Sequence, residues 1–381
     1  MVLHEPLAVR AAVLREMGRP RPYAETRPLE IADLRLDPPG PSEVLLKVRA
    51  AGLCHSDLSV INGSRPRVMP MVLGHEAAGE ILACGRGVTH VEPGDRVVLT
   101  FVPACGGCAP CRADRAALCE PGAAANTAGT LLTGARRWHD QSGAELHHHL
   151  GVSAFADHAV VAANSVVRVE RDLPFEIAAL FGCAVLTGVG AAVNAAGLRG
   201  GESVAVFGLG GVGLAAILGA KLAGAAEVIG IDVVPAKLAL AEELGATATI
   251  LARAADPVAA VRDLTRGGAD VAIETAGHEA VLAQAYAATR RGGTTVTVGL
   301  PDPSRMLTIP AVSLVAEERT LRGSYLGSGV PARDIPRFID YYRAGRLPVD
   351  RLLTHRIDLA HINEGFDRLA DGQGVRQAVI F

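Results

Sequence analysis

Four of the seven cysteines in this chain lie close enough in the sequence to bind one metal ion. They are Cys105, Cys108, Cys111 and Cys119, in the pattern C-x2-C-x2-C-x7-C, with glycine and proline residues between them that suit tight turns. Four sulfur ligands complete a tetrahedral Zn²⁺ and leave no position open, so the pattern predicts a structural zinc site. An iron–sulfur cluster is one alternative, although the spacing matches neither common ferredoxin pattern. A set of reduced thiols without a metal is the other.

Three further residues could form a second metal site of a different kind. Cys54 opens the segment CHSDL, His75 lies in VLGHEAAGEI, and Cys183 lies in LFGCAVLTG. Two cysteines and one histidine leave one zinc position open to solvent or substrate, which is a catalytic arrangement. Such a zinc acts as a Lewis acid and lowers the pKa of a bound oxygen. The three residues are far apart in the sequence, so their spacing alone supports the site weakly. Cys84 is expected to be a buried, inert thiol.

A glycine-rich turn predicts a nucleotide site. The segment Gly208-Leu-Gly210-Gly211-Val212-Gly213 has the pattern GxGxxG and follows the β-branched run SVAVF. Glycines there allow the backbone to approach a pyrophosphate at a helix N-terminus. Asp232 ends the next strand-like run, where a carboxylate would bind the ribose 2′-hydroxyl and disfavour a 2′-phosphate, so NAD is predicted over NADP. Lys237 could also reach the ribose. A glycine-rich packing turn with a helix-capping aspartate is the alternative.

The elements that must position this turn alternate regularly. Strands are predicted at 203–207, 227–232, 248–251, 270–274 and 294–300, and helices near 213–224, 235–244, 256–266 and 278–290. This alternation predicts βαβ units and a parallel sheet with helices on both faces.

Length and composition restrict the remaining possibilities. The 381 residues suggest two or three domains, and a net charge of −3 gives no basic excess for nucleic-acid binding. An odd number of cysteines and a start without a signal-like apolar stretch argue against a disulfide framework and favour a cytoplasmic location. Residues 177–198 and 203–220 lack charges as membrane spans do, but glycines interrupt both runs, so no membrane association is expected.

These residues together resemble the zinc-dependent medium-chain alcohol dehydrogenases over nearly the whole chain. The most specific motif is Gly74-His75-Glu76-x2-Gly79-x5-Gly85-x2-Val88, followed by PGDRV at 93–97, with the four-cysteine lobe, GLGGVG, and the ending RQAVIF at 376–381. The segment 147–161 and a long loop at 122–150 resemble the animal-type and class III branch, which is dimeric. The resemblance implies an α/β protein with a GroES-like, mostly-β catalytic domain and a Rossmann coenzyme domain with a doubly wound parallel sheet. The catalytic domain would comprise 1–184 and 325–381 with the zinc lobe at 105–119, and the NAD-binding domain 185–324.

The resemblance also implies roles for individual residues. Two zinc ions per chain would be bound, the catalytic one by Cys54, His75 and Cys183. Asp57 would hydrogen-bond His75, Glu76 would give electrostatic support, and Ser56 would accept the substrate proton. The pyrophosphate would contact His55 and Arg376. The nicotinamide would lie against Thr187, Val212 and Val298, and the substrate channel would be lined by Phe101, Ala124, His149 and Tyr325.

The implied activity is the interconversion of a primary alcohol and its aldehyde, by hydride transfer from a zinc-bound alkoxide to NAD. Ala124 leaves room and Phe101 offers a ring, so a bulky, aromatic or allylic alcohol is expected, and His149 would favour a polar substituent. A serine, Ser59, stands where many relatives carry a relay histidine, so the relay would end at His55 or in water.

A glutathione-dependent formaldehyde dehydrogenase is the alternative substrate class. Such an enzyme would need paired charges at the pocket mouth, whereas Arg65 and Arg67 stand where acids would be expected. A zinc-stabilised binding protein without activity, and a zinc-free enone or quinone reductase, are further alternatives. Neither explains the full set of ligands.

Overall fold

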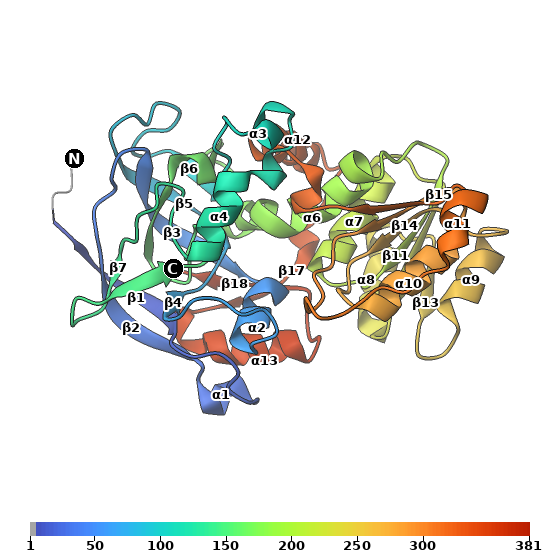
Figure 1. Ribbon diagram of the computed structural model, residues 1–381, viewed down its shortest axis with the longest axis horizontal. Coiled ribbons are helices and arrows are strands. Elements are labelled where there is room, and N and C mark those ends of the chain that lie inside the picture. The colour runs from blue at the N-terminus through green and yellow to red at the C-terminus, as the bar shows by residue number, and fades with distance from the viewer. Residues whose placement is uncertain (1–4) are drawn as a thin grey trace. The chain divides into compact units, whose positions relative to one another are not determined.

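The computed structural model describes residues 5–381, which fold into two compact units (Figure 1). The first unit comprises the described chain up to Cys183, together with Val330–Pro336 and Leu353–Phe381. The second comprises Ala184–Gly329 and Arg337–Leu352. The expected domain scheme assigns Ala184 and two segments, 325–329 and 337–352, to the catalytic domain, whereas all three belong to the second unit. The physical reason for 337–352 is local: Phe338 and Tyr341 line a pocket with Val193 and Leu222, all within the second unit.

The first unit is built mainly from short strands. A closed barrel has the order β1-β2-β7-β8-β4, and a second sheet has the order β10-β6-β5-β3-β18-β17 with β9 also paired to β3. The strands are β1 (Leu7–Leu14), β2 (Leu29–Leu36), β3 (Glu43–Leu53), β4 (Met71–Val72), β5 (Glu76–Cys84), β6 (Arg96–Leu99), β7 (Trp138–His139), β8 (Glu145–His148), β9 (His158–Ala162), β10 (Val166–Val169), β17 (Leu353–Ile357) and β18 (Arg376–Ile380). A buried apolar cluster that includes Val13, Leu34, Trp138 and Val160 fills the space between them.

Short helices connect these strands. They are α1 (Tyr23–Thr26), α2 (His55–Ile61), α3 (Ala109–Arg112), η1 (Ala116–Leu118), α4 (Glu120–Ala128), η2 (Ala163–Ser165), α5 (Phe175–Leu180), η7 (Leu359–His361) and α13 (Ile362–Ala370). The segment 122–150, predicted as a long loop, instead contributes helix α4 and the barrel strands β7 and β8. Alternating burial from Glu145 to His148 shows why: one face of this segment packs into the barrel.

The second unit confirms the α/β fold class. All six strands of its sheet run parallel, in the order β13-β12-β11-β14-β15-β16. The strands are β11 (Ser203–Phe207), β12 (Glu227–Asp232), β13 (Ala248–Leu251), β14 (Ala269–Glu274), β15 (Thr289–Thr297) and β16 (Thr320–Gly323). The helices are α6 (Leu186–Gly190), η4 (Ala191–Ala195), α7 (Gly211–Leu222), α8 (Pro235–Leu244), α9 (Pro257–Leu264), α10 (Glu279–Ala288), α11 (Ala311–Ala316), η5 (Leu326–Ser328) and η6 (Val349–Leu352).

The predicted strand at 294–300 has different bounds in the structure. β15 begins at Thr289 and ends at Thr297, and its register against β14 shifts between Ala269 and Val271. The irregularity falls where the sequence reads RRGG, which no alternation of apolar and polar residues marks as a strand.

One helical stretch within residues 5–381 is long and apolar enough to cross a membrane. It runs from Phe175 to Ala195, through α5, the π-helical turn η3 (Phe181–Val185), α6 and η4. Of its most apolar 18-residue window, 89% is buried inside the protein, as in the core helix of a folded domain. The other charge-free run, 203–220, forms β11 and most of α7, which are also buried. The remaining helix, α12 (Pro331–Arg343), has residues in both units.

Candidate metal and coenzyme sites

Strand pairing brings three distant segments of the first unit together. β3 ends at Leu53, which pairs with Gln377 of β18, and its neighbour Gly52 pairs with Glu76 at the start of β5. Cys54 therefore follows β3 at the point where His75 enters β5. Cys183 comes from the π-helical turn η3, and such turns often occur at functional sites.

Cys54, His75 and Cys183 form a compact ligand set. One potential ligand atom from each lies within 4.8 Å of the other two, and all three residues are buried. Two sulfurs and one imidazole nitrogen fit Zn²⁺ and occupy three of four tetrahedral positions. His75 Nε2 is buried and has no hydrogen-bond partner among residues 5–381, as expected for a nitrogen that would bind a metal.

Asp57 holds the opposite edge of the His75 ring. His75 Nδ1 lies 3.1 Å from Asp57 Oδ1 and 3.0 Å from Oδ2, and the carboxylate is fully buried. The carboxylate keeps the ring proton on Nδ1, so the lone pair is on Nε2. Burial is the largest effect on the pKa of His75 and lowers it, but the charge and hydrogen bond of Asp57, together with Cys54, raise this pKa well above its ordinary value.

The two thiols of this set interact with each other. A hydrogen bond with Cys183 lowers the pKa of Cys54 well below its ordinary value, against the opposing effect of burial. The same hydrogen bond raises the pKa of Cys183 well above its ordinary value. A divalent cation bound between the two sulfurs would favour loss of both thiol protons.

Glu76 and Arg376 form a buried ion pair beside this set. Arg376 Nη1 lies 3.6 Å from Glu76 Oε2 and also donates to Leu53 O at 3.3 Å. Burial raises the pKa of Glu76 to about 7, although the Arg376 charge acts to lower it. Sequence reasoning missed this pair: the arginine expected at the pyrophosphate is only 4% exposed and faces a carboxylate. Its coenzyme contact stays a prediction.

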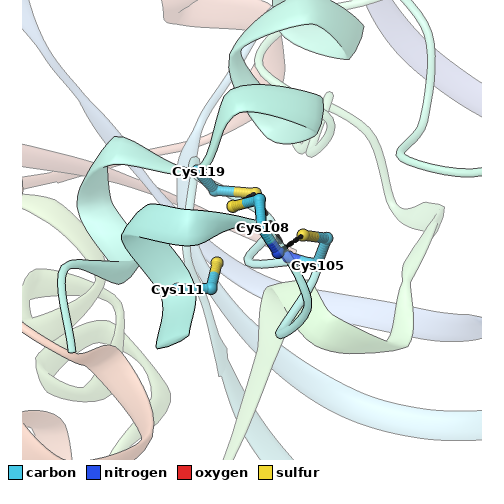
Figure 2. Close-up of side chains that lie close together, drawn as sticks. All are labelled: Cys105, Cys108, Cys111 and Cys119. Atoms are coloured by element: carbon cyan, nitrogen blue, oxygen red, sulfur yellow. Dashed lines mark hydrogen bonds between the residues drawn. The ribbon is translucent and has the colours of Figure 1, made fainter. Parts of the chain in front are cut away.

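The four cysteines of the lobe form a second group of potential metal ligands in the first unit (Figure 2). Figure 2 shows Cys105 and Cys108 before α3, Cys111 within it and Cys119 at the start of α4, with their sulfur atoms gathered together. The four Sγ atoms all lie within 4.8 Å of one another. Backbone N–H groups support them, for example Cys108 N donating to Cys105 Sγ at 3.3 Å and Gly122 N to Cys119 Sγ at 3.4 Å. This donor set fits a closed tetrahedral zinc site.

The glycine turn of the second unit has the shape that a phosphate requires. Gly208 has φ +91°, and a Cβ on Gly213 would lie 1.8 Å from Gly208 O, so both positions need glycine. A Cβ on Gly210 would instead meet open space, and no side chain caps the N-terminus of α7 there. The amide groups of this helix start therefore remain available to an anion.

Asp232 also supports the turn itself. Its Oδ2 accepts a hydrogen bond from Leu209 N at 2.6 Å and its Oδ1 from Val234 N at 2.9 Å. These contacts were not foreseen from the sequence, and the ribose contact stays a prediction. Lys237 is half-buried in the first turn of α8.

The three residues predicted to contact nicotinamide belong to the second unit. Thr187 is buried on α6, and a Cβ on the adjacent Gly188 would lie 2.2 Å from Val212 O, so α6 lies directly against the glycine turn. Val212 and Val298 are half-buried.

The residues of the CHSDL segment differ in exposure. Ser56 is half-buried and His55 is exposed, both in the first turn of α2. Ser59 donates its hydroxyl to His55 O at 2.8 Å, which occupies it with helix backbone.

Two of the four predicted pocket residues, Phe101 and His149, lie against the His75 ring. Phe101 lies edge-to-face against His75, with ring centroids 5.3 Å apart. Ala124 is exposed on α4, and Tyr325 is half-buried before η5 of the second unit. His149 is buried, and its Nε2 lies 3.3 Å from Asp57 Oδ1, a contact that no local sequence signal indicates.

Comparisons with known proteins identify two domain families in the chain. Residues 40–171 match the alcohol dehydrogenase GroES-like domain, and residues 211–343 match the zinc-binding dehydrogenase domain. The chain is 40% identical to an NDMA-dependent alcohol dehydrogenase of Amycolatopsis methanolica, over 98% of this chain and 99% of that protein.

Solved structures are also similar along the whole chain. An alcohol dehydrogenase zinc-binding domain protein from Burkholderia ambifaria has a TM-score of 0.93 and 37% identity, covering 99% of this chain and 100% of its own. Benzyl alcohol dehydrogenase from Acinetobacter calcoaceticus has a TM-score of 0.90 and 32% identity, covering 98% and 99%. Both domains of the family match, and the similarity extends over nearly the full length of the chain. The chain is therefore an oxidoreductase that belongs to the zinc-binding medium-chain alcohol dehydrogenase family.

Proposed function

We propose that this chain interconverts a primary alcohol and its aldehyde with NAD(H), and that the preferred alcohol is bulky, aromatic or allylic. Cys54, His75 and Cys183 would hold a catalytic zinc, and the four-cysteine lobe a structural one. The observation that carries the proposal is the convergence of two thiols and one imidazole nitrogen, which leaves a fourth tetrahedral position for substrate.

When bound, zinc supplies a Lewis acid that lowers the pKa of the alcohol hydroxyl, and the nicotinamide accepts the hydride. The chain's own residues position and deprotonate the substrate. Ser56 receives the hydroxyl proton and passes it toward His55. Asp57 fixes the orientation of His75, and the buried Phe101 packs edge-to-face with that ring.

The substrate preference rests on two observations. The Phe101 ring stands beside the ligand His75, where it can contact a flat apolar substrate. The structurally similar benzyl alcohol dehydrogenase is named for an aromatic alcohol. Preference for NAD rests on Asp232, the last residue of β12, whose carboxylate would bind a ribose hydroxyl and repel a 2′-phosphate.

We further propose a homodimer located in the cytoplasm. Met306, Val312 and Val315 of the second unit are 71–81% exposed, near the sheet edge formed by β16, and apolar side chains of this size favour burial against a second copy. All seven cysteines are free thiols, which suits a reducing compartment. Light scattering after size-exclusion chromatography tests the dimer, and a monomeric mass would contradict it.

The test of the activity compares substrates on the purified, zinc-loaded protein. Benzyl alcohol with NAD⁺ is expected to give NADH. The same reaction with added NDMA tests whether alcohol oxidation by this chain depends on NDMA, as the name of its relative states for that protein. A second arm supplies formaldehyde with glutathione. Turnover only in that arm would overturn the substrate proposal and favour a glutathione-dependent formaldehyde dehydrogenase.

The proton path has its own test. Replacing His55 with alanine is expected to shift the pH dependence of kcat/KM for alcohol oxidation. An unchanged profile would remove His55 from the path and leave the relay to end in water.

A further inference from the structure

A second buried histidine lies beside the proposed metal site and has no role in the reaction described above. His149 is 1% exposed, and its ring stands edge-on to that of His75, with centroids 5.6 Å apart at 77°. Its Nε2 lies 3.3 Å from Asp57 Oδ1 as an ion-pair contact, and neither ring nitrogen makes a hydrogen bond within residues 5–381. His149 therefore contacts the carboxylate that orients the metal ligand.

Asp57 is a fully buried carboxylate, so the donors around it decide where its oxygens point. Gly74 N donates to Oδ1 at 3.2 Å, and His75 Nδ1 lies within 3.1 Å of both oxygens. A carboxylate taken out of water needs several donors to offset its lost hydration. His149 Nε2 is the remaining side-chain nitrogen near Oδ1 among the contacts found in residues 5–381.

The backbone around His149 holds the ring in place. His149 N donates to Ser153 Oγ at 2.8 Å, and that hydroxyl donates to Val72 O at 2.7 Å. Leu150 and Ser153 both have positive φ, +52° and +54°, which side chains other than glycine rarely adopt. Strained backbone of this kind persists where the surrounding structure requires one geometry.

We propose that His149 is a positioning residue for the catalytic metal site: its Nε2, which has no hydrogen-bond partner within residues 5–381, faces Asp57 Oδ1 and by its attraction to that oxygen fixes the carboxylate that holds His75. Gly74 N and His149 Nε2 both lie against Asp57 Oδ1, and the same carboxylate contacts His75 Nδ1 through both of its oxygens. The inference rests on the proposed zinc site at Cys54, His75 and Cys183. It replaces the expectation that the His149 ring faces a polar substituent of the substrate.

The experiment measures the metal site directly, apart from turnover. Zinc content and zinc loss to a chelator are compared in wild type, His149→Leu, which removes the donor, and His149→Gln, which retains an N–H. His147→Leu is the matched control, because His147 is a half-buried neighbour in the sequence whose Nδ1 lies 3.1 Å from Pro70 O. The absorption spectrum of the Co²⁺-loaded proteins reports the ligand geometry.

We expect His149→Leu to weaken binding of one zinc per chain about 10–100-fold and to change the Co²⁺ spectrum, as loss of a partner behind a metal ligand does. The other zinc, in the four-cysteine lobe, stays bound and shows that the variant is folded. His149→Gln restores most of the affinity, and His147→Leu matches wild type. If His149→Leu aggregates, the proposal is tested on His149→Gln against His149→Met, where equal zinc loss in both overturns it.

Other results separate this inference from the proposed function. Unchanged zinc affinity in His149→Leu, with a higher KM only for alcohols that carry a polar group, overturns the positioning role and returns His149 to the substrate channel. A wild-type protein that binds one zinc per chain overturns both proposals. Two zinc ions with the expected His149 effect, but no alcohol oxidation, overturn the proposed function and leave the positioning role supported.

Discussion

Gly52 lies directly against Glu76: a Cβ at position 52 would stand 2.3 Å from Glu76 Oε1 and 2.8 Å from its carboxyl carbon. Gly52 and Glu76 are paired across β3 and β5, and the carboxylate is fully buried beside Arg376. The glycine thus provides the space that a buried acid needs next to the proposed metal ligands.

Gly52→Ala is expected to destabilise the fold by about 1–3 kcal/mol, because the added methyl must displace a buried charged side chain. Gly323→Ala is the control, since position 323 is also in a strand and has no neighbour within 4 Å of a Cβ. Denaturant unfolding of both variants checks the prediction. Equal stability of the two would mean that Glu76 moves aside without cost.

Removal of one sulfur from the four-cysteine lobe is expected to release one zinc per chain. Cys111→Ser leaves three thiols for a site that needs four, so the bound metal and the stability it supplies to the lobe are both lost. Metal analysis and thermal unfolding measure the effect. Cys84→Ser should leave both quantities unchanged, because Cys84 is outside both cysteine clusters. A full zinc content in Cys111→Ser would contradict the closed four-sulfur site.

Substitution of Asp232 is expected to have two separable effects. Asp232→Ala removes the acceptors for Leu209 N and Val234 N, so the glycine turn should lose about 1–3 kcal/mol of stability. It also removes the charge that would repel a 2′-phosphate, so the preference for NAD⁺ over NADP⁺ should fall. The ratio of kcat/KM for the two coenzymes measures the second effect. A lower stability with an unchanged ratio would restrict Asp232 to a structural role.

The buried His148 predicts a specific loss of stability in acid. Burial lowers the pKa of His148 to about 3, with the charges of Arg137 and Arg136 acting in the same direction. Below the unfolded-state pKa of about 6.5 the unfolded chain binds a proton that the folded state excludes, so stability falls by about 1.4 kcal/mol per pH unit down to the folded-state pKa.

His148→Gln is expected to remove this slope, because glutamine does not titrate and can still accept a hydrogen bond from Arg137 N, which His148 Nε2 accepts at 3.1 Å. Unfolding by denaturant between pH 6 and pH 4 measures the difference between the two proteins. If the unfolding free energies of wild type and His148→Gln change equally with pH, His148 is protonated within the folded state and the prediction is wrong.

The features that could be predicted from the sequence are those encoded by neighbouring residues. The cysteines from 105 to 119 lie within a few turns of one another, so their spacing alone indicates a shared ion. The GLGGVG turn and the strand and helix that flank it are likewise local, because hydrophobic periodicity and glycine conformation depend on short segments. The parallel sheet followed from the same patterns and is confirmed.

The tertiary structure decided which distant side chains meet. Cys54, His75 and Cys183 form one ligand set because the pairing of β3 with β5 and the turn η3 bring them within 4.8 Å. The pairing of β18 with β3 places Arg376 against Glu76, and the turn at 149–153 places His149 against Asp57. No local pattern encodes these contacts, because a buried charged or polar group takes whichever partner the packed chain brings within reach.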